Sequence, residues 1–163
     1  MDETIMGLSG IDWAYFGAAL AASGGGIGSA IGITIVSHAA TGVVSEDSEK
    51  FGRILPLAAM PGTQGIYGFI TALLVFIFFG VFDGSVDLSA HEGLRVFFSC
   101  LPVALVCLVS GIYQGSTAVG SAGMVARRDE DAGKALIFPA LVETYAVFSL
   151  IVTIIMMLYV TAG

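Results

Sequence analysis

The sequence has few charged residues: 12% of its 163 side chains are Asp, Glu, Lys or Arg, about half of what a soluble domain carries. Six Lys and Arg residues stand against 13 acidic ones, and the net charge of −7 argues against nucleic acid as a partner. Cysteine is scarce, and Cys100 and Cys107 are better explained as buried small side chains than as a disulfide or metal site. The remainder is apolar, with 56% hydrophobic residues and a mean hydropathy of +0.94. This composition is typical of a chain whose solvent is mostly lipid.

Charge is absent from four long stretches. Residues 13–45, 54–82 and 96–126 contain no Asp, Glu, Lys or Arg, and in residues 135–163 Glu143 is the single exception. A membrane-spanning helix needs about 20 apolar residues, and irregular backbone cannot face lipid. The sequence therefore predicts an all-α membrane protein with four transmembrane helices, at about 13–40, 54–82, 96–125 and 135–161. These would form two tandem helical hairpins, residues 1–82 and 83–163.

Basic residues are concentrated in two of the connections. Residues 41–53 and 126–134 together hold five of the six Lys and Arg residues. The positive-inside rule then predicts a multi-pass protein of the cell membrane with both of these loops in the cytoplasm and both termini outside. The acidic N-terminus lacks the basic region of a secretory signal, so the first span is expected to be retained.

Glycine recurs every fourth residue in the first span, at Gly24, Gly28 and Gly32, and the third span has a similar segment, GIYQGSTAVG. A phosphate-binding loop would need a Lys-Ser or Lys-Thr pair at a fixed spacing after a strand, and this pattern has neither. Small residues at helical spacing instead let helices approach one another closely. The glycines therefore predict tight helix packing, of the kind that suits the inner wall of a ring.

Three of the spans carry polar side chains at similar depths. At 1.5 Å per residue, Gln64 lies about 16 Å inside its span, Glu143 about 13 Å and Gln114 about 20 Å. A carboxylate at such a depth costs several kcal/mol unless it is protonated, paired or bound to a cation, and no span contains a Lys or Arg that could pair with it. Carboxylate, amide and hydroxyl oxygens, the last from Thr63, are the ligands of a hard cation. The pattern predicts a small-cation site.

The segment MPGTQG adds a backbone ligand to this set. Pro61 has no N–H and so removes a helical hydrogen bond to residue 57. The carbonyl of Met60, beside the break, becomes available as a further oxygen donor. This gives the predicted site a ligand that does not depend on side-chain identity.

Each of the polar residues also has a purely structural interpretation. Thr63 and Gln114 could form hydrogen bonds between helices, and Glu143 could be a protonated structural acid. Tyr67 could pack at a helix interface or donate its hydroxyl hydrogen to Glu143. The convergence of several polar groups at one depth favours the cation site over these separate explanations.

Three segments carry a resemblance to a known family: LPLAAMPGTQGIYGF, SGIYQGSTAVG and FPALVETYAVF. With its four spans, the chain resembles the proteolipid ring subunit (the K or c subunit) of the V-type, or V/A-type, rotary ATPases in its duplicated two-hairpin form. It is similar to the sodium-pumping bacterial members. The resemblance covers essentially the whole chain and implies a non-catalytic, ion-translocating rotor subunit.

The resemblance implies that Glu143 carries Na⁺ across the membrane as ATP hydrolysis elsewhere in the complex turns the ring. The implied ligands are Glu143, Gln114, Gln64, Thr63 and the backbone carbonyl of Met60, with Tyr67 hydrogen-bonded to the glutamate. In single-hairpin relatives each second helix has its acid five residues before a Tyr. The first hairpin has Gly62 at that position, so one ion site per four helices is expected.

The implied partners are identical copies forming a ring, a stator membrane subunit whose arginine displaces the ion, central-stalk subunits at the cytoplasmic loops, and lipid. No nucleic acid and no nucleotide bound by this chain are expected. Two alternatives stay open at this stage. The ring could carry H⁺ instead of Na⁺, since a protonated glutamate needs fewer oxygen ligands, or the chain could be a tetra-spanning structural membrane protein.

Overall fold

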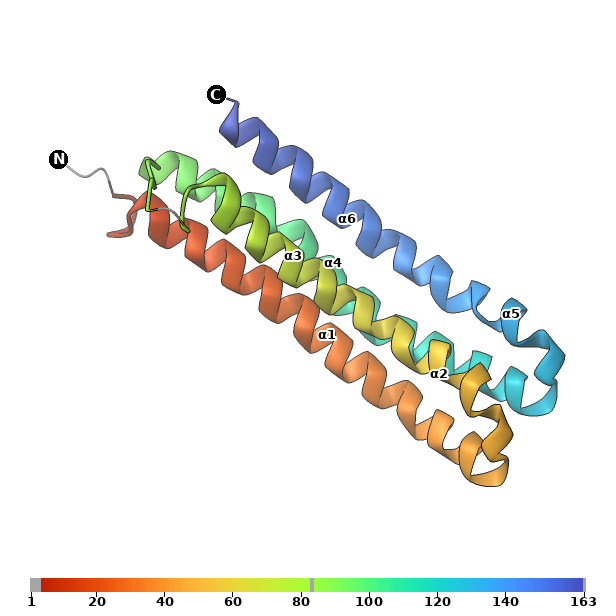
Figure 1. Ribbon diagram of the computed structural model, residues 1–163. Coiled ribbons are helices and arrows are strands. Elements are labelled where there is room, and N and C mark those ends of the chain that lie inside the picture. Colours follow the sequence, from red (N-terminus) through yellow and green to blue (C-terminus); the bar gives the residue numbers. More distant parts are fainter. Residues whose placement is uncertain (1–3, 83, 163) are drawn as a thin grey trace.

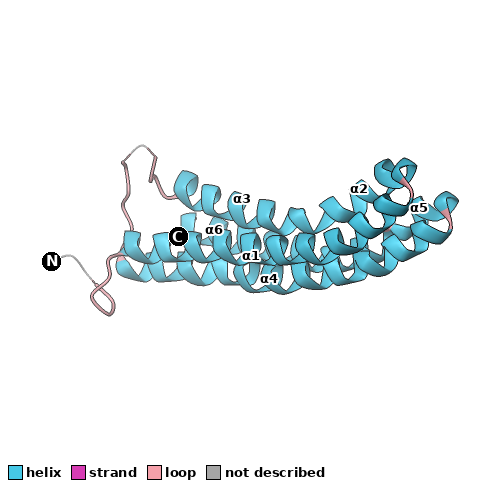
Figure 2. Ribbon diagram, turned by 90° about the horizontal axis from the view of Figure 1, so that it is seen from below, coloured by secondary structure: helices cyan, strands magenta, loops and turns pink. Residues whose placement is uncertain are grey.

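The computed structural model describes residues 4–82 and 84–162, and within these residues the chain is helical, with no β-strand. Four long helical units lie side by side (Figures 1 and 2). The elements are α1 (Gly10–Glu46), the 3₁₀ turn η1 (Ser48–Lys50), α2 (Phe51–Ala59), the 3₁₀ turn η2 (Met60–Gly62), α3 (Thr63–Phe78), α4 (Ala90–Arg127), the 3₁₀ turn η3 (Asp129–Asp131), α5 (Ala132–Ala135) and α6 (Ile137–Thr161).

Each of the four units is long and apolar enough to cross a membrane: 37 residues from Gly10, 31 from Ser48, 38 from Ala90 and 33 from Asp129. At 1.5 Å per residue they measure about 45 to 57 Å, more than the ~30 Å hydrocarbon layer. The prediction of an all-α protein with four membrane spans is therefore confirmed. The predicted boundary between the two hairpins adjoins residue 83, which lies outside the described residues.

The first helix of each hairpin begins at the same local motif. The backbone N–H of Ser9 donates to the carboxylate of Asp12 at 2.9 Å, and that of Ser89 donates to Glu92 at 2.8 Å. In both cases an acid three residues into the helix satisfies the N–H at its start, which is a capping box. Two helices of 37 and 38 residues are thus given defined beginnings near the end of the bundle where both termini lie (Figure 1).

The glycines of α1 bring it against α4 at very short range. A Cβ atom added at Gly24 would lie 2.2 Å from the carbonyl oxygen of Ala104, and one at Gly32 would lie 2.1 Å from that of Gly111. No residue with a side chain fits at such positions without a shift of the backbone. The glycine repeat serves close packing between the two hairpins of one chain.

The opposite end of the bundle, where the turns around Ser48 and Asp129 lie, is here called the short-turn end. Polar contacts join the hairpins there. The ammonium group of Lys50 donates to the carbonyl of Ala126 at 2.7 Å, and the guanidinium of Arg53 is paired with the carboxylate of Asp129. These contacts connect the first turn to the second across 76 residues of sequence.

Candidate ion-binding site

The helix break predicted at Pro61 places two polar side chains at the start of α3. The chain leaves α2 at Ala59, passes through the 3₁₀ turn η2 and re-enters an α-helix at Thr63. The hydroxyl of Thr63 donates to the carbonyl of Met60 at 3.0 Å. Gln64 follows and is fully buried, so its amide must find its hydrogen-bond partners inside the bundle.

The partner of the Gln64 nitrogen comes from α4, and that partner in turn bonds to the start of α6. The amide nitrogen of Gln64 donates to Gln114 Oε1 at 2.6 Å. Gln114 is also fully buried, and its own nitrogen donates to the carbonyl of Pro139 at 3.1 Å. A carbonyl one turn before Glu143 is thereby tied to α4. The two glutamines connect α3, α4 and α6 at one level of the bundle.

Glu143 on α6 completes the cluster. The hydroxyl of Tyr67 donates to Glu143 Oε1 at 2.8 Å, and the amide nitrogen of Gln114 approaches Oε2 at 3.4 Å. No ion pair between described residues includes this carboxylate. Its charge is thus met by two hydrogen-bond donors from separate helices rather than by a cationic side chain.

All six residues singled out in the sequence lie together, but two of the amides are turned differently from what a shared cation would require. The oxygen of Gln114 accepts from Gln64, and the oxygen of Gln64 lies 3.3 Å from the Thr63 hydroxyl, which shares its single hydrogen between this oxygen and the nearer carbonyl of Met60. It is the nitrogen of Gln114 that faces the carboxylate. The cluster therefore forms a directed chain of hydrogen bonds that runs from Thr63 through both glutamines to Glu143.

The oxygen donors of the cluster are hard ligands of mixed type: one carboxylate, two amides, one hydroxyl and one backbone carbonyl. Among the described residues, no group of three or more His, Cys, Asp or Glu side chains is arranged to hold a metal ion. A site with a single carboxylate suits a monovalent cation in terms of charge, because one negative charge balances one positive charge. A divalent ion there would leave a net positive charge in a low-dielectric interior, which is costly.

Sequence reasoning missed Ser29. Its hydroxyl oxygen accepts the backbone N–H of Gly65 at 2.7 Å. Gly65 is the third residue of α3, and the first N–H groups of a helix have no acceptor within it. A buried side chain of α1 thus caps the helix that carries Thr63 and Gln64. The sequence signal for this role is the serine within the glycine-rich segment GIGSAIG of the first span.

The two hairpins each match one known family. The model of the family described as the C subunit of ATP synthase matches the chain twice, over residues 16–75 and 97–156. The chain belongs to this family. The two matches are offset by 81 residues at both ends, so each hairpin of this C-subunit family member is one family unit. At that offset Gly62 corresponds to Glu143, in agreement with one acidic position for every four helices.

Two curated relatives resemble this member of the ATP synthase C-subunit family over most of its length. It is 39% identical over 158 residues to the V-type sodium ATPase subunit K of Enterococcus hirae, and the match covers 97% of this chain and 98% of that protein. It is 38% identical over 148 residues to the A-type ATP synthase subunit K of Methanocaldococcus jannaschii, covering 91% of this chain. The matched region spans 64% of the length of the second relative.

Proposed function

We propose that this chain is a rotor-ring subunit of a V-type rotary ATPase and that it carries Na⁺ on Glu143. The observation that carries the proposal is the cluster in which Tyr67 and Gln114 both donate to this half-buried carboxylate, on one of four helices long enough to span a membrane. Family membership and the sodium ATPase relative support the rotor role and the choice of ion.

The amide of Gln114 provides the means of binding the ion. A half turn of this amide would put its oxygen where its nitrogen now lies, next to Glu143 Oε2 and the carbonyl of Pro139. Oxygens that converge in this way repel one another unless a cation lies between them. Entry of Na⁺ would therefore exchange the present hydrogen-bonded arrangement for one in which the oxygens of Gln64, Gln114 and Thr63 face the ion.

This exchange neutralises the carboxylate, and neutralisation is what permits rotation. An ionised Glu143 facing lipid would be a barrier of several kcal/mol, whereas an ion-loaded Glu143 carries no net charge. A positive group on a stator subunit, an arginine in the resemblance described above, would displace the ion and hold the carboxylate while it is empty. The chain itself contributes the site and the rotation but no hydrolysis.

The assembly and orientation follow the same proposal. Identical copies form the ring, lipid surrounds it, and central-stalk subunits contact the short-turn end. That end carries most of the basic residues, so it faces the cytoplasm and both termini face outside. Gly62 takes the place of an acid in the first hairpin, so each copy moves one ion per passage of the stator. Fewer ions per ATP allow pumping against a steeper gradient.

The test is labelling of Glu143 by a carbodiimide in the isolated ring, which requires a protonated, uncoordinated carboxyl group. Sodium at neutral pH is expected to slow the labelling, and potassium at the same ionic strength is not. The Glu143→Gln variant is the control, because it should show no labelling at this position. Labelling that depends on pH but not on sodium would assign the ring to H⁺ transport, and failure to isolate a ring would refute the rotor role.

A further inference from the structure

Small polar side chains continue beyond the candidate ion site, between α3, α4 and α6, toward the end of the bundle where both termini lie. These three helices contact one another, and the hydrogen bond from Gln64 to Gln114 fixes the relative level of α3 and α4. Thr71 lies seven residues beyond Gln64 on α3. Cys107 lies seven residues before Gln114 on α4, which runs in the opposite direction (Figure 1). Both side chains are therefore about 10 Å from the glutamines along the bundle.

The third helix adds side chains at the same height. The thiol of Cys107 lies 3.9 Å from the hydroxyl of Ser149 on α6, so these two residues share a level. Ser110 lies about one turn nearer to the glutamines, and Thr153 about one turn farther from them. The exposed fraction is 6% for Ser110 and Ser149 and 0% for the other three. These five residues are here called the polar column: Thr71, Cys107, Ser110, Ser149 and Thr153.

Three hydroxyls of the polar column have no partner in the protein. The side-chain oxygens of Thr71, Ser110 and Thr153 are buried and form no hydrogen bond. Hydroxyls elsewhere in the spans donate to a carbonyl three or four residues earlier in their own helix, among them those of Thr34, Thr41 and Thr117. A buried hydroxyl without a partner is costly, and valine or alanine would avoid that cost at the same positions. The three hydroxyls therefore point to a partner that is not part of the chain.

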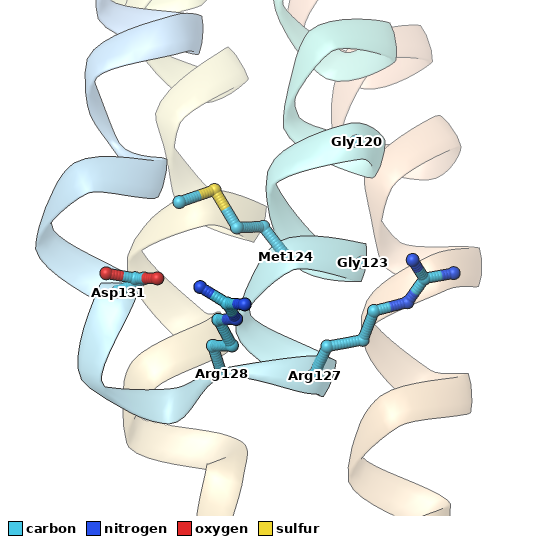
Figure 3. Close-up of a pocket in the computed structure, with 6 residues that line it drawn as sticks. All are labelled: Gly120, Gly123, Met124, Arg127, Arg128 and Asp131. Atoms are coloured by element: carbon cyan, nitrogen blue, oxygen red, sulfur yellow. The ribbon is translucent and has the colours of Figure 1, made fainter.

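Buried polar side chains in other parts of the bundle are satisfied. Ser121 donates to the carbonyl of Ala135 at 2.7 Å. Asp131, toward which the Arg128 side chain extends in Figure 3, accepts from Lys134 at 2.6 Å. Among the described residues, five buried side-chain nitrogen or oxygen atoms have no hydrogen-bond partner, and three of the five belong to the polar column. The lack of partners is thus concentrated in one place between three helices.

The polar column leads to the carboxylate of the candidate site. Tyr67 lies one turn before Thr71 on α3, and its hydroxyl donates to Glu143. Gln114 lies one turn after Ser110 on α4, and its amide also donates to Glu143. On α6 the buried residues after this acid are small, Ala146 and then Ser149 and Thr153, and the next one is the apolar Met157. The polar atoms therefore begin at Glu143 and end at an apolar side chain.

We propose that the polar column binds ordered water molecules, held by the hydroxyls of Thr71, Ser110 and Thr153. A buried water molecule makes about three hydrogen bonds, and three helices contribute polar atoms here. Water both donates and accepts, as hydroxyl partners require, whereas a cation would find no carboxylate within the column. The water molecules extend to Glu143 and solvate its carboxylate when no ion is bound. This last role rests on the proposed function, because it requires an ion that leaves the site.

The test is hydroxyl-radical labelling of the isolated, sodium-free ring by X-rays, read by mass spectrometry. X-rays split bound water into hydroxyl radicals that oxidise adjacent side chains, so a buried residue is labelled where water is bound beside it. Cys107 is the reporter and Cys100 the control, because both are fully buried. The Cys100 thiol faces Gly17 of α1, not the polar column. Cys107 is expected to be oxidised severalfold faster than Cys100, and equal rates would overturn the proposal.

Substitutions that keep the volume connect the water to the hydroxyls. Thr71→Val combined with Thr153→Val should lower the rate of Cys107 oxidation to that of Cys100. Thr34→Val is the matched control, since that hydroxyl donates to Ala30 in its own helix at 2.8 Å. Unchanged oxidation of Cys107 in the double variant would refute the role of the hydroxyls, and so would a ring of higher thermal stability, which would mean that they had been dry. If the double variant does not assemble, Ser110→Ala should still reduce the labelling.

Sodium binding tests the solvation of Glu143. Water that stabilises the ion-free carboxylate competes with sodium, so the double variant should need less sodium to halve the carbodiimide labelling of Glu143. An equal or higher half-protecting concentration would refute the solvating role. The failure of this inference is distinct from that of the proposed function. An unmodified ring in which sodium does not slow the labelling would refute sodium transport, whereas the oxidation of Cys107 decides whether the water is present.

Discussion

Substitution of Gln114 by leucine tests the centre of the candidate site. The side chain is fully buried, and its amide makes three contacts: it accepts from Gln64 at 2.6 Å and donates to Pro139 at 3.1 Å and to Glu143 at 3.4 Å. Leucine has a similar volume but no polar atom. The change therefore removes the amide oxygen proposed as an ion ligand and leaves the general packing of α4 in place.

The expected loss can be estimated from the contacts. A hydrogen bond or ligand contact to a charged group is worth about 1.5–3 kcal/mol. At about 1.4 kcal/mol for each factor of ten, the affinity for sodium falls roughly 10- to 100-fold. The nitrogen of Gln64 also loses its acceptor, which lowers the free energy of unfolding by about 1–3 kcal/mol.

The assay measures the sodium concentration that halves the rate of carbodiimide labelling of Glu143 in the isolated ring. In Gln114→Leu this concentration should rise by the factor above, with ring assembly checked by electron microscopy. Thr117→Ala is the matched control, since the Thr117 hydroxyl donates only to the carbonyl of Tyr113 in its own helix, at 2.8 Å. A half-protecting concentration within twofold of that of the unmodified ring would refute the ligand role of Gln114.

Three further substitutions have distinct expected results. Tyr67→Phe removes the 2.8 Å hydrogen bond to the Glu143 carboxylate and should weaken sodium protection about tenfold, for about 1.5 kcal/mol, the lower end of the range for a hydrogen bond to a charged group. An unchanged value would mean that the hydroxyl does not orient the acid. Gly32→Ala places a methyl group 2.1 Å from a carbonyl oxygen and should lower the thermal stability of the ring through about 1–3 kcal/mol of overpacking. The control is Gly42→Ala, whose methyl group meets nothing within 4 Å and should raise the thermal stability slightly. Equal effects of the two variants in calorimetry would contradict the close approach of α1 and α4. Ser29→Ala leaves the N–H of Gly65 without its 2.7 Å acceptor and should increase the rate of amide hydrogen exchange at the start of α3. Mass spectrometry measures this rate, and a rate equal to that of the unmodified chain would contradict the capping role of Ser29.

The architecture and the membership of the cluster could be read from the sequence because both depend on burial in lipid. Uncharged stretches define spanning helices, and an isolated Glu143 needs partners at its own depth. The rise per residue of a helix is fixed, so the number of residues from the charged end of each span gives the depth of Gln64 and Gln114 in the membrane, and this depth is similar to that of Glu143. Pro61 marked the break because its missing N–H acts locally.

The orientation of the amides could not be obtained in this way. Whether Gln114 presents its oxygen or its nitrogen to Glu143 depends on the acceptor at Pro139, which no spacing along the sequence reveals. The role of Ser29 was hidden for the same reason, because its partner lies 36 residues away on another helix. Contacts between distant elements follow from their relative rotation, which the pattern of apolar residues leaves unspecified in helices that are apolar on every side.

The polar link at the short-turn end, from Lys50 to Ala126 and from Arg53 to Asp129, has a mechanical consequence for a rotor. A tangential force on Glu143 acts first on α6 and tends to shear it past α3 and α4, to which Tyr67 and Gln114 connect it. The polar contacts across the two turns hold the hairpins together at one end, and the close packing of α1 against α4 holds them together along their length. The four helices then move as a stiff block, so the displacement produced at the carboxylate reaches the far end of the subunit without being absorbed by sliding within it.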